Sequence, residues 1–322
     1  MSPRRPFPID PVLTGIAIGY RNQAQTLIAD LVLPRQEVAA EEFKWNSFPM
    51  NESFTVPDTR VGRTSRVNTV TFSCKEETDS VEDYGLDSPI PNSDIKTAAD
   101  MRREKRSLYD PEKHAAMSLT DLILLDREVR VAGLVQNKDK YNPSARVTLS
   151  PTDQFNDYDN SDPLEIIHEA KRKSLIYRPN TAVMGDSVWA KLKRHPVLVN
   201  AVRGNLTNKG IISIQEFADL MEIKNVYIGE SQVNTARKGQ AANLQYCWGN
   251  SLELLYIDPL SRTDDPRPTW GMTAQYGTRI SGRIEDPYVG LEGGYAIRVG
   301  ERVKELVIAP DVGVIITNAV TP

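Results

Sequence analysis

The sequence predicts an α+β fold in which a compact α/β domain is inserted into a larger, β-rich domain. Three observations predict it. Hydrophobic spacing indicates one long helix over residues 111–136, helices and short strands alternate between residues 162 and 261, and strand patterns occur both before residue 83 and after residue 269. Because the late strands follow the compact region, we expect them to return and pack against the long helix.

The long helix has a well-marked start, since Asp110 supplies an N-cap acceptor and Pro111 suits the first turn. Apolar residues then recur at steps of three or four, which predicts one apolar stripe: Ala115, Leu119, Leu122, Leu125, Val129 and Ala132. A second apolar set lies off this stripe, so the helix needs cover on two sides: Ile123, Leu124, Val131, Leu134 and Val135. Charged residues between 121 and 130 exclude a transmembrane span.

Residues 1–40 are predicted to form an N-terminal arm. Four early prolines should keep its beginning extended: Pro3, Pro6, Pro8 and Pro11. A short apolar patch over residues 27–33 ends at Pro34. This segment has too little apolar surface to fold alone, so we expect it to lie across another surface.

Residues 41–83 are predicted to form a protruding β-hairpin. Phe43 and Trp45 alternate with polar residues in its first strand. The second strand is predicted at residues 69–74, where Val70, Phe72 and Cys74 alternate with threonine and serine. Residues 51–68 between them are polar. An isolated two-stranded ribbon is marginally stable, so the hairpin needs a partner.

A turn-rich joint at residues 84–91 precedes a short charged helix predicted at residues 94–108. This helix contains the densest basic run of the chain: Arg102, Arg103, Lys105 and Arg106. Two interpretations stay open for the run, namely contacts with phosphates, or salt bridges and a solvated helix face. Residues 137–162 then form a polar loop, with one strand predicted at residues 146–149.

In the compact region, Asp162 and Asp186 are predicted to open helices, a third helix runs from Pro196 to a stop at Gly204, and residues 213–216 form a capping box. Its strands are predicted at residues 181–184, 226–228 and 252–257, and the late strands at residues 272–276, 296–299, 303–308 and 314–317.

Composition points away from nucleic-acid readers and secreted proteins. The chain has 39 basic and 43 acidic residues, for a net charge of −4. Cys74 and Cys247 are far apart and lack partners at metal-ligand spacing, so we expect two free, mostly buried thiols. His114, His168 and His195 are expected at the surface or at helix ends.

Catalytic patterns are missing from the sequence. No phosphate loop or dinucleotide fingerprint is present, Ser187 lacks the second glycine of a nucleophile elbow, and His168 has Arg172 where a second metal ligand would stand. The glycine-rich residues 287–295 carry Glu292, which would repel an anion, and are predicted to be a turn. We therefore predict no catalytic residue, no cofactor and no metal site.

The order of the elements resembles the Hong Kong 97-type fold of the major capsid proteins of tailed bacteriophages. Three segments also resemble phage capsid phrases: residues 54–63 (FTVPDTRVGR), 118–131 (SLTDLILLDREVRV) and 229–239 (GESQVNTARKG). The resemblance covers nearly the whole chain and implies a structural subunit without enzymatic activity.

The resemblance implies a division of the chain into four parts: an N-arm at residues 1–40, an extended loop at 41–83, a peripheral domain at 84–150 and 270–322 with its spine helix at 111–136, and an axial domain at 151–269. It further implies self-assembly into hexamers and pentamers of an icosahedral head that encloses double-stranded DNA, in the virion after assembly in the host bacterial cytoplasm. Portal, scaffolding and decoration proteins would be partners, with no membrane involved.

The hairpin and arm are expected to bury themselves on neighbouring copies. We expect hairpin contacts through Phe43, Trp45, Phe54 and Val56, and pairing of neighbouring carboxylates with Arg60, Arg63 and Arg66, unless these arginines only form a solvated tip. An encapsulin-type nanocompartment is the alternative of the same fold. A cytosolic enzyme with an unrecognised site is the lesser alternative.

Overall fold

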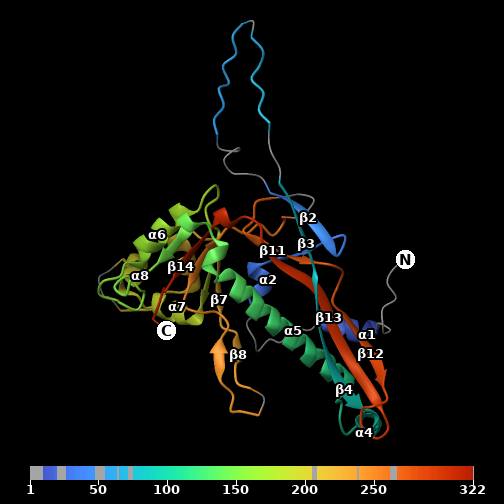
Figure 1. The fold of residues 1–322 in the computed structure, drawn as a ribbon. Coiled ribbons are helices and arrows are strands. Elements are labelled where there is room, and N and C mark those ends of the chain that lie inside the picture. The colour runs from blue at the N-terminus through green and yellow to red at the C-terminus, as the bar shows by residue number, and fades with distance from the viewer. Residues whose placement is uncertain are drawn as a thin grey trace.

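The computed structural model describes residues 10–19, 27–47, 55–63, 65–71, 75–204, 209–237, 239–261 and 267–321. One long helix, α5 (Pro111–Val135), runs along a five-stranded sheet and ends against a second five-stranded sheet (Figure 1). The mixed α+β class predicted from the sequence is confirmed.

The first sheet, called the long sheet, has the order β1-β11-β13-β12, and β4 pairs with β13 off this path. Its longest strand, β13, lies antiparallel to β4, β11 and β12. The strands are β1 (Arg35–Glu37), β4 (Glu82–Pro91), β11 (Gly271–Gln275), β12 (Ile280–Asp286) and β13 (Gly294–Val307). The sequence predicted β13 as two strands and missed β12.

The second sheet, called the compact sheet, has the order β5-β14-β10-β6-β7. Its strands are β5 (Arg146–Thr148), β6 (Thr181–Gly185), β7 (Asn225–Gly229), β10 (Leu252–Leu255) and β14 (Gly313–Thr317). Four helices share a hydrophobic cluster with this sheet: α6 (Pro163–Lys173), α7 (Asp186–Leu192), α8 (Pro196–Arg203) and α9 (Ile214–Met221). The predicted capping box is present, because the Ser213 and Glu216 side chains each accept from the other's backbone N–H, at 3.2 and 2.7 Å.

The last strand departs from the expected arrangement. Residues 314–317 were expected to pack against the long helix together with the other late strands, but β14 pairs with β10 and β5 in the compact sheet. Only one face of β14 meets the helix side, where Ile315 clusters with Val131 and Val135. The backbone N–H and C=O groups of a short buried strand need hydrogen-bond partners, so the strand joins the sheet that supplies them. The order of the elements in the sequence does not show which of the two sheets this is.

The buried stripe of α5 also differs from the predicted one. Leu122 and Val129 are exposed, whereas the buried face includes the polar Thr120, Arg127 and Glu128. The other buried residues of this face are Pro111, Ala115, Ala116, Leu119, Ile123, Val131, Ala132 and Val135. Hydrophobic spacing misplaced the stripe because its middle turn is charged rather than apolar.

The arm packs on its own chain. Pro11, expected to help keep the beginning of the arm extended, instead starts helix α1 (Pro11–Gly19), because Asp10 caps the helix and Leu13 and Ala17 are buried with α5 and the long sheet. Helix α2 (Ala29–Val32) and strand β1 follow, and β1 pairs with β11 in parallel. Residues 1–9, with Pro3, Pro6 and Pro8, lie outside the described part.

Remaining elements are short. Helix α4 (Asn92–Arg103) ends earlier than predicted, where Lys105 takes a positive φ of 56°. The 3₁₀ turns are η1 (Lys138–Lys140), η2 (Pro143–Ala145) and η3 (Pro310–Val312). In the described part of the chain, no helix combines the length and apolar character that crossing a membrane requires.

The start of α5 yields a first prediction. The Asp110 carboxylate accepts from the backbone N–H groups of Glu112 and Lys113, at 3.2 and 3.5 Å, and pairs with Arg102 at 2.7 Å. We expect Asp110→Ala to lower the free energy of unfolding by about 1 kcal/mol, because it removes the cap. Urea unfolding of the isolated subunit measures this loss. Asp110→Asn is the control, since it keeps an N-cap acceptor, and equal losses in both variants would show that the ion pair dominates.

Candidate functional site

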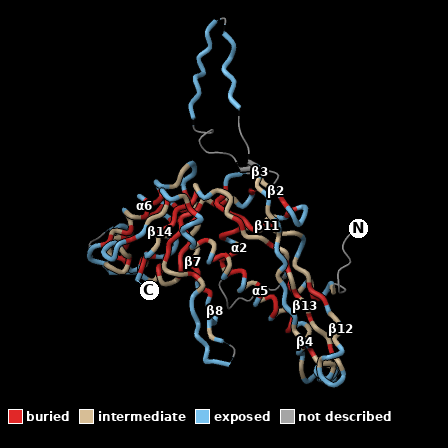
Figure 2. Tube along the Cα trace, in the orientation of Figure 1, coloured by how far each residue is buried: buried red, intermediate tan, exposed pale blue. Residues whose placement is uncertain are grey.

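A loop projects from the molecule between strands β2 (Glu42–Ser47) and β3 (Lys75–Ser80). The two strands are antiparallel and pair Phe43 with Asp79 and Trp45 with Glu77. Beyond them, residues 55–63 and 65–71 extend away from the body (Figure 1), and every residue there whose burial is described is exposed (Figure 2). The predicted protruding hairpin is therefore present, and its second strand is at 75–80. Residues 69–71, predicted to begin that strand, are not part of it, and residues 72–74 lie outside the described residues.

The base of the hairpin is attached to its own subunit. Phe43 is buried with Met272 and Leu306 of the long sheet, and its ring stacks on Trp45 with centroids 5.8 Å apart. The expectation that Phe43 contacts neighbouring copies is therefore wrong, because its apolar surface is already covered. Val56 is 90% exposed and stays available, and Phe54 lies outside the described residues.

The loop carries an exposed cationic segment. Arg60, Arg63 and Arg66 are all exposed, and no ion pair joins them to a carboxylate within the described residues. Asp58 organises the local turn, since its side chain accepts from Arg60 N–H at 3.0 Å and its carbonyl from Asn68 at 2.7 Å. The loop thus offers positive charge and β-branched side chains to solvent.

A cluster of charged residues ties the arm, α5 and the long sheet together. It is called the charged junction and consists of Asp30, Arg35, Arg127, Glu128, Arg130, Arg279, Glu301 and Glu305. Arg35 bridges the arm's Asp30 at 2.7 Å and Glu301 of β13 at 2.9 Å. Burial alone would raise the pKa of Asp30 and Glu301, but the guanidinium charges around them hold both pKa values below the ordinary range.

The two buried charges of α5 lie at the centre of this junction. Arg127 pairs with Asp30 and donates to the Leu33 carbonyl at 3.2 Å and to Thr273 Oγ1 at 2.9 Å. Glu128 accepts hydrogen bonds from the arm and from the compact part of the molecule. From the sequence, both residues were treated only as charges that interrupt an apolar run, and no local signal marks their partners about 100 residues away.

The basic run around α4 pairs with its own chain. Arg102 pairs with Asp110, Arg103 with Asp100 and Arg106 with Glu104. These contacts favour the salt-bridge interpretation over phosphate contacts.

The histidine and cysteine expectations have mixed outcomes. His195 lies at a helix end, as expected, but it is buried rather than at the surface: its Nε2 lies 2.9 Å from Ser161 Oγ and its Nδ1 accepts from Val197 N–H. Burial lowers its pKa, which favours this neutral form. Cys247 is free and half-buried, and Cys74 lies outside the described residues.

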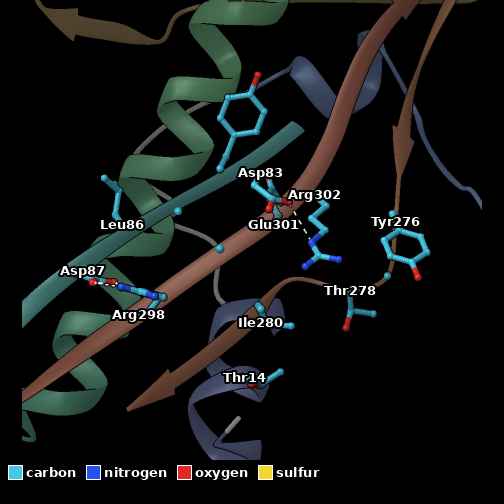
Figure 3. Close-up of a pocket in the computed structure, with 14 residues that line it drawn as sticks. Thr14, Asp83, Leu86, Asp87, Tyr276, Thr278, Ile280, Arg298, Glu301 and Arg302 are labelled. Atoms are coloured by element: carbon cyan, nitrogen blue, oxygen red, sulfur yellow. Dashed lines mark hydrogen bonds and ion pairs between the residues drawn. The ribbon is translucent and has the colours of Figure 1, made fainter. Parts of the chain in front are cut away.

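A solvent-open groove of about 860 Å³ lies over the long sheet (Figure 3). The acidic groups at its rim pair with neighbouring arginines, Asp87 with Arg298 at 2.6 Å and Asp83 with Arg302 at 3.0 Å. Within the described residues, no group of three or more His, Cys, Asp or Glu side chains is placed to hold a metal ion. Ser187 donates to Asn250 at 3.0 Å, as expected of a structural residue.

Two curated relatives cover nearly the whole chain. It is 46% identical over 315 residues to the major capsid protein of Pseudomonas phage JBD67, which covers 98% of both chains. It is 30% identical over 313 residues to the major capsid protein of Burkholderia phage BcepMu, which covers 90% of this chain and 95% of the relative. No protein-family model matches the chain.

Solved structures share the fold. A phage-related protein from Bordetella bronchiseptica RB50 aligns over 99% of this chain and 100% of its own, with a TM-score of 0.74 and 20% identity. The capsid structure of cyanophage P-SCSP1u aligns over 92% of this chain and 90% of its own, with a TM-score of 0.58 and 10% identity. The fold is thus one that phage capsid subunits use. With the relatives, it shows that the chain belongs to the family of phage major capsid proteins, whose role is structural.

Proposed function

We propose that copies of this chain assemble into hexamers and pentamers that close into the icosahedral head around double-stranded phage DNA. The observation that carries the proposal is the projecting loop at residues 55–63 and 65–71, all of which are exposed. The relatives named major capsid proteins support it. They favour a virus head over an encapsulin-type nanocompartment and over a cytosolic enzyme.

In this proposal the loop lies over a neighbouring copy, where Val56 loses its exposure and Arg60, Arg63 and Arg66 meet carboxylates. Each contact is modest, but a closed shell repeats it in every subunit, and a net charge of −4 per chain limits mutual repulsion. The described part of the arm, bound to its own subunit, contributes less to neighbours than the sequence indicated.

We further propose the four-part division of the Hong Kong 97-type fold, with an N-arm at 1–40, an extended loop at 41–83, a peripheral domain at 84–150 and 270–322, and an axial domain at 151–269. The division has one exception. Strands β5 and β14 have residue numbers within the peripheral domain, but they pair in the compact sheet. Portal, scaffolding and decoration proteins are the proposed partners, and assembly takes place in the host bacterial cytoplasm.

Deletion of residues 51–68 tests the assembly role. We expect the shortened subunit to keep its urea unfolding midpoint, since the described part of this segment is exposed, and to form no closed shells. Sedimentation velocity and negative-stain images of the wild-type and shortened proteins measure the outcome. Closed shells of unchanged stability would refute the role of the loop.

A finer variant separates charge from apolar contact. The triple substitution Arg60→Gln, Arg63→Gln and Arg66→Gln should leave shells that still form but dissociate at a lower urea concentration than wild-type shells, because it removes only the ionic part of the contact. Shells as urea-resistant as the wild type would show that these arginines form only a solvated tip.

A further inference from the structure

Glu128 of α5 receives hydrogen bonds from two parts of the chain that are far apart in sequence. It is fully buried, and its carboxylate is the meeting point of the arm and the compact region. Oε2 accepts from Ala29 N–H at 2.8 Å, and Oε1 accepts from Ile28 N–H at 3.1 Å, Trp248 Nε1–H at 2.7 Å and the Ser231 hydroxyl at 3.4 Å.

On the arm side, Glu128 caps helix α2. Ile28 is the N-cap of this four-residue helix, and its side chain makes no capping hydrogen bond. The carboxylate therefore supplies the acceptor that the local sequence lacks. Arg127 pairs with Asp30 in the first turn of α2 and donates to the Leu33 carbonyl at the other end, so consecutive residues of α5 contact both ends of α2.

On the compact side, Glu128 holds the base of a second projecting hairpin. Strands β8 (Gln232–Asn234) and β9 (Leu244–Tyr246) are antiparallel and leave the body next to β7 (Figure 1). Ser231 directly precedes β8, and Trp248 follows β9 by two residues. A backbone bond from Cys247 N–H to the Ser231 carbonyl, at 2.9 Å, closes the base.

The Trp248 ring is buried and packs directly against the backbone of Gly229. A Cβ at Gly229, the last residue of β7, would lie 2.0 Å from a ring carbon, so only glycine lets the ring pack there. Strand β9 itself is exposed, with Leu244 at 61% and Tyr246 at 47%. Because these side chains have little cover, the orientation of the hairpin is set at its base.

We propose that Glu128 is a positioning residue that couples docking of the subunit's own arm to the placement of the β8–β9 hairpin. If the arm undocks, the Glu128 carboxylate loses the hydrogen bonds from the two backbone amides of the arm. The carboxylate then shifts its position relative to its remaining donors or binds water, and this change loosens the base of the hairpin. A subunit then presents the exposed face of β9 to other copies in one fixed orientation only while its arm is docked. This consequence for assembly rests on the proposed function, but the coupling itself does not.

Thermodynamic coupling is reciprocal, which makes the proposal testable in the isolated subunit by amide hydrogen exchange. Trp248→Phe removes the indole N–H and keeps an aromatic ring, and we expect exchange at Ile28 and Ala29 to rise on the order of tenfold. Asp30→Asn loosens the arm without touching Glu128, and we expect exchange in β8 and β9 to rise by a similar factor. In a protein that also carries Glu128→Gln, Trp248→Phe should not change exchange at Ile28 and Ala29, and Asp30→Asn should not change exchange in β8 and β9.

The control is Asp126→Asn, a carboxylate-to-amide change at an exposed position on the same helix, which should change exchange in neither segment. Exchange of the β10 amides reports global unfolding. Each increase in exchange rate is therefore divided by the increase in exchange rate at β10. A ratio near one at the remote segment in both variants would overturn the coupling, because the arm and the hairpin would then respond independently of each other.

Assembly provides a second readout. Trp248→Phe and Asp30→Asn should both lower the yield of closed shells relative to Asp126→Asn at equal subunit concentration. Reduced yield with no remote change in exchange would overturn the coupling and leave the proposed function standing. If the variants change exchange in the distant segment but the wild-type protein itself forms no shells, the coupling is supported and the proposed function is contradicted.

Discussion

Replacing Arg127 with methionine is expected to lower the free energy of unfolding of the subunit by about 3–5 kcal/mol, although methionine suits a helix as well as arginine does. Arg127 is 1% exposed and donates to Leu33, Thr273 and Asp30. The substitution leaves the Leu33 carbonyl and the Thr273 hydroxyl without this donor in the protein interior. Asp30 keeps Arg35 but loses its buried partner.

The same substitution at Arg298 is the matched control. Arg298 forms a two-pronged pair with Asp87, with both bonds at 2.6 Å, but each side chain is 39% exposed. A surface pair contributes roughly 0–1 kcal/mol, so Arg298→Met should cost little. Urea unfolding of both isolated variants measures the difference. Equal losses would mean that the interior of the charged junction is hydrated and that burial does not set the cost.

Local signals predicted those parts of the fold that are encoded in neighbouring residues. Asp110 and Pro111 placed the start of α5 correctly, and its end at Val135 lies one residue from the prediction. The Ser213 capping box, the stop of α8 at Gly204 and the short β5 strand were also predicted. These features depend on contacts within about four residues, which a single sequence displays.

Contacts between distant segments were not predictable in the same way. The β3 strand was missed because its residues are polar and charged and give it no apolar face; it pairs with β2 through backbone bonds, and exposed ion pairs such as Lys44–Glu76 at 2.9 Å lie beside them. The buried roles of Arg127 and Glu128 depend on arm residues about 100 positions away. The sequence therefore predicted the protruding loop of the candidate site, but it did not predict the charged junction that holds the arm, α5 and the long sheet together.

Replacing Glu253 with glutamine is expected to stabilise the subunit at pH 8 and to flatten the dependence of its stability on pH. Glu253 lies in the middle of β10, fully buried, and the partner of its Oε1 is Ser251 Oγ, at 2.5 Å. Among the described residues, no group forms a hydrogen bond with its Oε2. Burial raises the pKa of this carboxyl from 4.5 to about 8.

The sign follows from proton binding. Between about pH 4.5 and 8 the folded state keeps the Glu253 proton while the unfolded chain releases it, so stability falls as the pH rises through this window. At about 1.4 kcal/mol per pKa unit, the loss is roughly 3–5 kcal/mol, and glutamine, always neutral, avoids it. Urea unfolding of wild type and Glu253→Gln at pH 5 and pH 8 measures the difference.

Glu301 supplies the opposite control, because it is also buried but paired with Arg35 and Arg279, at 2.9 Å each. Burial opposes ionisation, yet these two charges hold its pKa below 4.5, so its contribution is present above the unfolded pKa and is lost as the pH falls. Glu301→Gln should therefore destabilise the subunit at pH 8, where Glu253→Gln stabilises it. If both variants lose stability at pH 8, Glu253 is ionised and paired in the folded subunit, and the strand that carries it is held by charge rather than by a neutral carboxyl.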